Sequence, residues 1–376
     1  MPSISLTQAR AIGLAAQQLT RPTGSPPDPR ALLDDLGCIQ IDTINVVRRS
    51  HELVLLTRGV PSEPAQVALG TDVPAPLAFE YYAHAACFVP LRSWPLFAFR
   101  RRQFQAGRWT GPTIEPEAVA HVRGLVDDRG AVTVRDLGGS QGSGWDRSSP
   151  LKWAAEWLLA TGELACVRRR AWMRQYARST DVIPADVRHD ELDDESCLRQ
   201  LCHIALRALG VATADDIADY FRMPSRLVAR IMPTLPGVVP VTVETWTAPA
   251  FTTAYHLDTA PVHVPPLTVL SPFDSLIWHR PRMQRLFGVA YKLEAYLSPD
   301  RRECGYFGLP VLHDGQIVGR VALRCTNGVA QVEGVQTRDA EALPALRRAA
   351  DQAAQWANAT VAPHSWPNLA APAPVR

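Results

Sequence analysis

Gln40 and Asp42 are the residues whose type and spacing best suggest chemistry. They stand two apart in the segment Gly37-Cys38-Ile39-Gln40-Ile41-Asp42-Thr43. In extended backbone, residues i and i+2 project to the same side, so the two polar side chains face one way while Ile39 and Ile41 face the core. On composition alone a simpler interpretation is stronger, in which Asp42 is the N-cap of the following helix and Gln40 is a surface residue.

The two interpretations of Asp42 are compatible. A carboxylate at a helix N-terminus is favoured in its charged form, which makes it a poor general acid at neutral pH but a good electrostatic stabiliser. Cleavage of a glycosidic bond develops positive charge on the sugar, and such a carboxylate could stabilise it. It could also orient or deprotonate the attacking water.

The composition indicates a globular protein of several domains. The chain has 376 residues, of which 47% are hydrophobic, and this length favours two to four small domains. No apolar run approaches the length of a membrane span, and the N-terminus has no signal segment. We therefore expect a cytoplasmic protein without a membrane segment, and a monomer in the absence of any obvious dimerisation helix.

The cysteines do not predict a metal site. The seven cysteines are scattered and form no CxxC pair. Cys197, Cys202 and His203 could be considered as zinc ligands, but their spacing is better explained as the inner face of a helix. We expect no metal and no cofactor.

The net charge of +2 conceals a segregation of charges along the chain. Two stretches, 91–108 and 165–179, each hold five arginines and no acid, and a third group lies within 280–285. The stretch 181–195 carries seven acids against one arginine. Arginine clusters beside aromatics suit phosphate backbones, although any single cluster could equally be a solvated face. Together they favour a polyanionic partner.

Periodicity and turn residues divide the chain into four parts. Helices are expected at 6–19, 30–36 and 43–57, with Gly37 ending the second. Helices at 116–128 and 150–160 and a basic hairpin at 163–176 have the order of a winged helix, as do helices at 195–209, 212–221 and 225–232 before a strand at 238–246. From 265 onward strands are expected at 289–296, 305–312, 316–324 and 329–335, with turns at 313–315 and 327–328, a final helix at 339–356 and a disordered tail.

Four longer stretches extend this picture: GCIQIDTINVVRRSHELVLLTR from Gly37, YYAHAACFVP from Tyr81, LSPFDSLIWHRPRMQRLFGVAYKLEAY from Leu270, and GYFGLPVLHDGQIVGRVAL from Gly305. In this order the chain resembles, over nearly its whole length, the crosslink-repair DNA glycosylases called AlkZ and AlkX (YcaQ-like). The resemblance implies an α+β protein, C-shaped around DNA, with three tandem winged-helix units (1–114, 115–194 with the acidic linker, and 195–264) and a C-terminal β-barrel-like domain (265–376).

The resemblance also implies an activity and a site. The family excises N7-alkylguanine from double-stranded DNA, including one arm of an interstrand crosslink. Its catalytic motif is Gln, an apolar residue, then Gln or Asp, so Gln40 and Asp42 are the catalytic candidates. The Asp form is similar to AlkX and departs from the form of the antibiotic self-resistance branch, which favours general DNA repair.

Further residues are candidates for DNA contact. His84 lies in a family-like segment but is equally well explained as a core or capping histidine. Arg48 and Arg49 could bind phosphate or pack the helix, and Trp278 and His279 could belong to a DNA-probing loop. The full set of DNA-binding candidates is Asn45, Arg48, Arg49, His51, His84, Arg100, Arg101, Arg102, Arg168, Arg169, Arg170, Trp278, His279, Arg280 and Arg282.

The leaving group and the lysine content limit the mechanism. N7-alkylguanine is already cationic, so its departure needs little acid catalysis. Glycosylases that also nick DNA use an amine nucleophile, often a lysine, and the chain has only Lys152 and Lys292. We therefore predict a monofunctional enzyme. The alternatives are a winged-helix regulator without catalysis and a protein that gives self-resistance to an alkylating natural product, for example by sequestering it; only the enzyme releases a free base.

Overall fold

The structure is a computed structural model that describes residues 1–20, 28–61, 77–139, 149–170, 172–258, 267–337 and 339–366, without the side chains of Arg168 and Arg170. The chain forms two compact units. The discontinuous unit comprises residues 1–65 and 202–376, and the inserted unit comprises residues 66–201. Helices and sheets occur in both, which confirms the α+β class.

The first part of the discontinuous unit carries the Gln-Ile-Asp motif. Its elements are β1 (Ser3–Ile4), α1 (Leu6–Ala16), α2 (Pro29–Leu36), β2 (Ile39–Gln40) and α3 (Ser50–Thr57). The capping box of Ser5 and Gln8 starts α1, and Asp28 caps α2 by accepting from the Arg30 N–H at 3.0 Å. Helix α2 ends where the sequence predicts, because Gly37 takes a left-handed conformation with φ +69°.

The predicted helix at 43–57 is wrong in its first half. Residues 43–49 form bends, and α3 begins only at Ser50. This stretch contains four β-branched residues, which have lower helix propensity. Glu52, in the first turn of α3, accepts from the Arg49 N–H at 3.0 Å and thereby fixes the later start.

The middle of the discontinuous unit is a small sheet with two helices. Its elements are β8 (Ala212–Thr213), α10 (Ala214–Tyr220), α11 (Ser225–Ile231), η3 (Met232–Thr234), β9 (Val238–Val243), β10 (Ala250–Thr253) and α12 (Ala254–Asp258), preceded by α9 (Asp194–Leu209), which runs across the division between the units. The strand order is β1-β9-β10-β8, with β1 parallel to β9. Thr213 and Asp216 form the capping box that starts α10.

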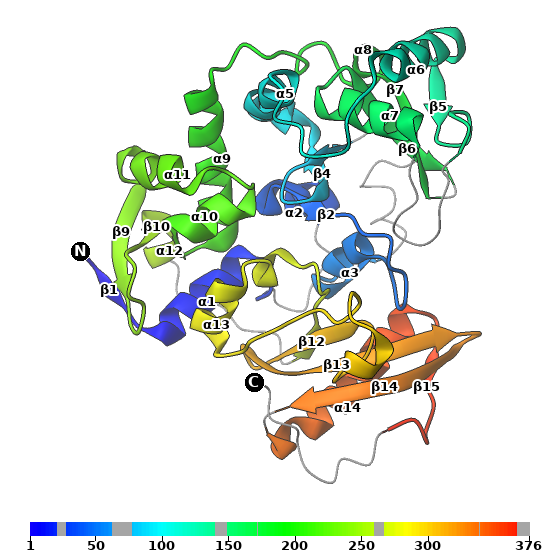
Figure 1. The fold of residues 1–376 in the computed structure, drawn as a ribbon. Helices are drawn as coiled ribbons and strands as arrows, with labels where there is room; N and C mark the ends of the chain where they lie inside the picture. The colour runs from blue at the N-terminus through cyan, green and yellow to red at the C-terminus, as the bar shows by residue number, and fades with distance from the viewer. Residues whose placement is uncertain are drawn as a thin grey trace. The chain divides into compact units, whose positions relative to one another are not determined.

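The C-terminal part is a five-stranded sheet covered by one long helix (Figure 1). Its elements are β11 (Leu267–Val269), η4 (Ser275–Ile277), α13 (Arg280–Phe287), η5 (Pro299–Arg301), β12 (Gly308–His313), β13 (Gln316–Thr326), β14 (Val329–Thr337), η6 (Ala340–Ala342), α14 (Leu343–Trp356) and β15 (Thr360–Val361). Both predicted hairpin turns are confirmed, with positive φ at Asp314, Gly315, Asn327 and Gly328.

One predicted strand is absent. Residues 289–296 have no strand conformation, although Tyr291, Leu293 and Ala295 are buried in the core as alternation predicts. The reason is Glu294, whose buried carboxylate accepts from the N–H groups of Cys304 at 2.9 Å and Gly305 at 3.2 Å. The segment thus serves as a cap for another loop. The Pro/Ala tail beyond Trp366 lies outside the described residues.

The inserted unit holds three strand–helix groups. Its elements are β3 (Ala78–Tyr82), β4 (Ala86–Pro90), η1 (Leu91–Phe97), α5 (Ala98–Gln105), α6 (Pro116–Arg129), β5 (Ala131–Thr133), α7 (Pro150–Ala160), β6 (Leu164–Arg170), β7 (Met173–Arg178) and α8 (Ser179–Val182). The predicted basic hairpin is the antiparallel pair β6–β7, with β5 added to β7. The order helix, strand, helix, hairpin is therefore present, and the assignment of three winged-helix units stays a prediction.

Candidate active site

The Gln-Ile-Asp motif follows a helix end that is held on both sides. The hydroxyl of Tyr220 donates to the carbonyl of Leu36 at 2.6 Å. A Cβ at Gly37 would lie 2.4 Å from Cγ2 of Ile204 and 3.2 Å from Cζ of Phe221. The chain therefore passes close to α9 and α10 here, and only glycine fits both the space and the positive φ.

The predicted alternation in the motif is confirmed. Cys38, Ile39 and Ile41 are buried, whereas Gln40 and Asp42 are partly exposed. The two polar side chains are thus available from the surface while their apolar neighbours anchor the segment in the core.

Asp42 does not cap a helix as expected. Its Oδ1 accepts a 2.7 Å hydrogen bond from the N–H of Ile44, which closes a turn well before α3 begins at Ser50. Burial raises the pKa of the Asp42 carboxyl, against the opposing effects of the Ile44 and Thr43 N–H groups and of the Arg49 charge. A backbone turn and one arginine, rather than a helix terminus, thus favour the ionised form.

Two of the DNA-binding candidates lie beside the motif. Arg49 donates from Nη1 to the carbonyl of Thr43 at 3.1 Å and acts on Asp42 through its charge. Asn45 is exposed in the same loop. His51, by contrast, is buried in the first turn of α3.

The loop that follows the motif and helix α3 are both hydrogen-bonded to the C-terminal part of the unit (Figure 1). Arg48 donates from Nε to the carbonyl of Trp356 at the end of α14. Its guanidinium therefore has a partner within the protein, and its contact with phosphate stays a prediction. The hydroxyl of Thr57 donates to the carbonyl of Val269 in β11 at 2.7 Å. Hydroxyls of Ser50 and Ser271 lie 3.3 Å apart.

A buried ion pair underlies this attachment. Arg58 Nη1 lies 2.7 Å from Asp274 Oδ2, and both side chains are fully buried. Arg58 also donates from Nε to the carbonyl of Gln17 at 2.8 Å, and Gln17 Oε1 accepts from the hydroxyl of Ser275 at 2.5 Å. The network therefore links the ends of α1 and α3 to η4.

The basic group at 280–285 is directed mainly into the protein. Arg282 is buried and donates to the carbonyl of Leu209 at 2.8 Å, and burial lowers its pKa to about 10. Arg280 donates to the carbonyl of Ile277 at 2.6 Å and lies over the ring of Tyr291 at 4.6 Å. These two guanidinium groups have roles in packing that the sequence does not reveal.

His279 and Trp278 lie at the start of α13. His279 Nδ1 is 2.6 Å from Oδ1 of buried Asp216, which also pairs with Arg285 at 2.6 Å. Although burial alone raises it, His279, Arg282 and Arg285 together lower the pKa of Asp216 to about 2. Trp278 packs against Tyr220, with ring centroids 5.1 Å apart. Because the Tyr220 hydroxyl also donates to the carbonyl of Leu36, Trp278 packs against a residue that holds the C-terminal end of α2.

Two arginines of the first cluster pair with acids of the acidic stretch within the inserted unit. Arg101, which is 1% exposed, pairs with Asp190. Arg102 pairs with Asp194 at 2.5 Å. Arg100 is buried and donates to the carbonyl of Ala83 at 2.8 Å. These three guanidinium groups thus have partners within the protein, and their contact with phosphate stays a prediction.

Two arginines of the second cluster are held by buried acids. Arg169 lies 2.6 Å from Glu80, and Arg174 bridges Glu80 at 2.8 Å and Glu156 at 2.6 Å. His84, in the turn between β3 and β4, is also buried. The side chains of Arg168 and Arg170 lie outside the described residues.

Two residues near these sites have no signal in the sequence. Asp216 lies in the first turn of α10 and pairs with both His279 and Arg285. Tyr296 belongs to a segment predicted as a strand, yet its side chain is 63% exposed. The charge of Asp42 raises the pKa of its hydroxyl, after the larger effect of partial burial. Both relationships join residues far apart in the chain, which periodicity cannot detect.

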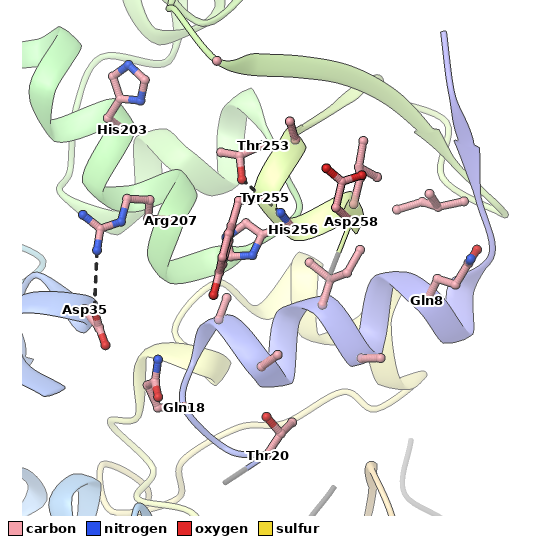
Figure 2. A pocket seen from close by; sticks show the side chains of 18 of the residues that line it. Gln8, Gln18, Thr20, Asp35, His203, Arg207, Thr253, Tyr255, His256 and Asp258 are labelled. Atoms are coloured by element: carbon pink, nitrogen blue, oxygen red, sulfur yellow. Dashed lines mark hydrogen bonds and ion pairs between the residues drawn. The ribbon is translucent and has the colours of Figure 1, made fainter. Parts of the chain in front are cut away.

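A large cavity lies elsewhere in the discontinuous unit (Figure 2). It has a volume of about 890 Å³ and is lined by α1, the end of α9, β10 and α12. Tyr255 and His256 project from α12, and the ion pair of Arg207 with Asp35, at 3.3 Å, lies at one side. Neither Gln40 nor Asp42 lines it, so the motif does not open into this cavity.

The described residues contain neither a cluster of metal-binding side chains nor a membrane-spanning helix. Within these parts of the chain, no three or more His, Cys, Asp or Glu side chains gather as they would around a metal ion. The buried Cys197 and Cys202 confirm the inner helix face predicted for them. No helix in the described segments has the length and hydropathy needed to span a membrane.

Comparison with known proteins identifies the family. A family model described as DNA glycosylase AlkZ-like matches residues 33–356. Among solved structures, the Streptomyces sahachiroi DNA glycosylase AlkZ is similar in fold, with a TM-score of 0.63 and 17% identity over 96% of this chain and 100% of that one. At this identity the structural likeness concerns the fold, while the family match spans most of the sequence and includes the motif at Gln40 and Asp42. The chain therefore belongs to the AlkZ-like family of DNA glycosylases.

Proposed function

We propose that this protein hydrolyses the N-glycosidic bond of N7-alkylguanine in double-stranded DNA, including one arm of an interstrand crosslink. The observation that carries the proposal is the partly exposed pair Gln40 and Asp42, held on a rigid turn within a DNA glycosylase family. We further propose that it serves general DNA repair, which the Asp form of the motif favours, and that it works as a monomer.

Asp42 is proposed to stabilise the developing sugar cation and to orient water. In the substrate the alkylated guanine carries a positive charge. When the bond between C1′ and N9 breaks, its electron pair goes to N9 and the base leaves neutral. Water adds to C1′ and its proton passes to Asp42 or to solvent. An ionised carboxylate beside C1′ would lower the energy of the oxocarbenium-like transition state.

Gln40 is proposed to hold the water or the sugar by hydrogen bonds. Its amide offers both a donor and an acceptor, and it lies on the same side of the segment as Asp42. A lysine nucleophile is not part of the proposal. Lys152 lies beside the Trp153 ring at 5.2 Å, and Lys292 is the only other lysine of the chain. The product is then an abasic site without a strand break.

An open binding surface suits this substrate. A base that is still linked to the opposite strand cannot be fully extruded into a closed pocket. Asn45 and Arg49, in the loop after Asp42, are the nearest candidates for contact with the DNA backbone. Their proposed role is to hold the lesion at the motif without enclosing it.

Base release tests the proposal directly. Duplex DNA with N7-methylguanine or a nitrogen-mustard crosslink is incubated with wild type, D42N and Q40A, and with D35N as a matched control from the cavity. We expect wild type and D35N to release the free base without nicking, and D42N to be slower by about 100-fold or more. Tight DNA binding without base release from either substrate would favour a regulator or a sequestering protein instead.

A further inference from the structure

A second cavity lies within the inserted unit. It has a volume of about 560 Å³ and is lined by residues of η1, α5, α6 and α7 and of the loop that follows α8. A cavity of this size accommodates a small-molecule ligand. Its described lining residues all belong to the inserted unit, whereas Gln40 and Asp42 belong to the discontinuous unit. The cavity is therefore a different site from the Gln-Ile-Asp motif.

The charged side chains that line this cavity leave one arginine over. Glu163 pairs with Arg123 at 2.6 Å, and Asp190 pairs with Arg101. Arg188 also lines the cavity, and it forms no ion pair with any acid of the described residues. Because each lining carboxylate already has an arginine partner, the guanidinium of Arg188 gives the cavity an excess positive charge that suits an anion.

Two nitrogen atoms of the cavity wall need an acceptor. Nη1 of Arg188 and Nδ1 of His189 are buried and have no hydrogen-bond partner among the described residues. A buried donor without an acceptor is unfavourable, because it has lost its hydrogen bonds to water. Both residues are only half-buried, so rotation of either side chain can present its nitrogen to a ligand. Phosphate oxygens are suitable acceptors for a guanidinium and for a protonated ring nitrogen.

The loop that carries these two side chains is held in place. The N–H of Arg188 donates to the carbonyl of Pro184 at 2.9 Å, which closes a turn. Arg101 donates from Nε to Oδ2 of Asp190 at 3.1 Å, and Arg102 donates from Nη1 to the Asp190 carbonyl at 3.0 Å. Because the loop is fixed before a ligand arrives, binding costs little backbone ordering.

Two tryptophans give the same cavity an aromatic component. Trp94 is 3% exposed, and the guanidinium of Arg101 lies 4.3 Å from the centre of its ring. Trp157 also lines the cavity and is only half-buried, so its ring is the more accessible of the two. A tryptophan ring can stack on a base. The cavity thus offers a surface for each of the two parts of a nucleotide, the phosphate and the base.

We propose that this cavity binds a nucleotide, with the phosphate at Arg188 and His189 and the base against Trp157. A free nucleotide and a nucleotide of a DNA strand present the same two groups, and the experiment below distinguishes them. The inference goes beyond the proposed function, because the cavity takes no part in bond cleavage at Asp42.

The test is calorimetric titration of the full chain with dGMP and with deoxyguanosine. R129Q is the matched control, since Arg129 belongs to the same unit, is 53% exposed and does not line the cavity. We expect R188Q to bind dGMP about 10- to 100-fold more weakly than wild type, R188K to recover part of this loss and R129Q to match wild type. Deoxyguanosine, which lacks the phosphate, should bind wild type and R188Q equally.

The base contact has its own variant. W157L should also weaken the binding of dGMP, by about 10-fold, and an unchanged affinity would overturn the assignment of the base to Trp157. Urea unfolding checks that R188Q and W157L are folded. Because Arg188 has no partner that the fold requires, R188Q should unfold at the same urea concentration as wild type.

Titration of the same variants with a short DNA duplex identifies the source of the nucleotide. Weaker duplex binding by R188Q than by R129Q, without binding of dGMP, assigns the site to a nucleotide of a DNA strand. Weaker dGMP binding with unchanged duplex binding assigns it to a free nucleotide, and a loss with both probes assigns it to both. Equal affinities of R188Q and R129Q for both probes overturn the proposal. These measurements need no base release, so they decide the site even if the proposed function fails.

Discussion

Oδ1 of Asp42 accepts a 2.7 Å hydrogen bond from the backbone N–H of Ile44, two residues further along the chain. This bond fixes the carboxylate on a turn and leaves it partly exposed. It also opposes the effect of burial, which raises the pKa of Asp42. Whether the group is ionised at a given pH therefore depends on a balance between desolvation and a few local donors and charges.

The pH dependence of base release should follow Asp42. Since the pKa of Asp42 is raised and the ionised form is required, the rate of wild type should fall with acidification at a higher pH than for an ordinary carboxyl. The pH profile of single-turnover release checks this, with the uncatalysed release subtracted. D42N should have a low rate without this acidic limb; an unchanged limb in D42N would assign it to another group.

Arg49 should shift that profile. Its charge lowers the pKa of Asp42, so R49Q should move the acidic limb to higher pH. R222Q is the control, because Arg222 is exposed, pairs with Asp219 and is not among the groups that act on Asp42. Equal profiles for R49Q and wild type would contradict the electrostatic role of Arg49.

Asp42 should also not stabilise the fold at neutral pH. A carboxyl whose pKa is raised in the folded state contributes stability below its unfolded value and loses it as pH rises through the folded value. D42N is therefore expected to unfold in urea at a concentration no lower than wild type at pH 7. A clear loss of stability would show that the N–H groups of Ile44 and Thr43 and the charge of Arg49 stabilise the ionised carboxylate by more than its desolvation costs.

Gly37 should be required for the motif to hold its place. G37A must adopt φ +69° and bring a methyl group within 2.4 Å of Ile204. We expect a loss of about 2 to 4 kcal/mol in the free energy of unfolding. G237A is the matched control, since Gly237 has φ +72° but no atom within 4 Å of the added Cβ, and it should lose only about 1 kcal/mol. Similar losses in both variants would show that packing against Ile204 does not matter.

The Arg58–Asp274 pair should be important for stability. Both side chains are fully buried, so D274A leaves a guanidinium without its charged partner and should cost about 3 to 5 kcal/mol in urea unfolding. The surface pair of Arg324 and Glu333 offers a comparison, because Arg324 is 69% exposed. R324A should cost less than about 1 kcal/mol. A small effect of D274A would mean that the network rearranges around Arg58.

Glu80 should make the inserted unit sensitive to acid. Burial alone raises its pKa, but Arg174 and Arg169 lower it to about 2 from an ordinary 4.5. Its contribution to stability is thus present above the ordinary value and lost as pH falls toward 2. E80Q should cost about 3 to 5 kcal/mol at pH 7, and the difference from wild type should shrink in acid.

The control for Glu80 is D127N in the same unit. Asp127 pairs with Arg178 but is 55% exposed, so its loss should cost less than about 1 kcal/mol. If E80Q and D127N lower the free energy of unfolding by the same small amount, the pair of Arg169 with Glu80 does not stabilise the fold. Arg169 would then be available for contact with DNA.

The sequence alone determined features that depend on neighbouring residues. The alternation of Gln40 and Asp42 with Ile39 and Ile41, the end of α2 at Gly37 and the turns at 313–315 and 327–328 all follow from local backbone preferences. The family was also identified from the order of its motifs, because these extend over most of the chain.

Only the tertiary structure decided features that join distant residues. Arg58 pairs with Asp274, which lies 216 positions further along the chain. Arg101 and Arg102 pair with Asp190 and Asp194. The charge of Asp42 raises the pKa of Tyr296. Charge runs in a sequence record how many arginines there are but not which acids they meet. The state of Asp42 likewise depends on burial, which is set by packing against segments far away along the chain.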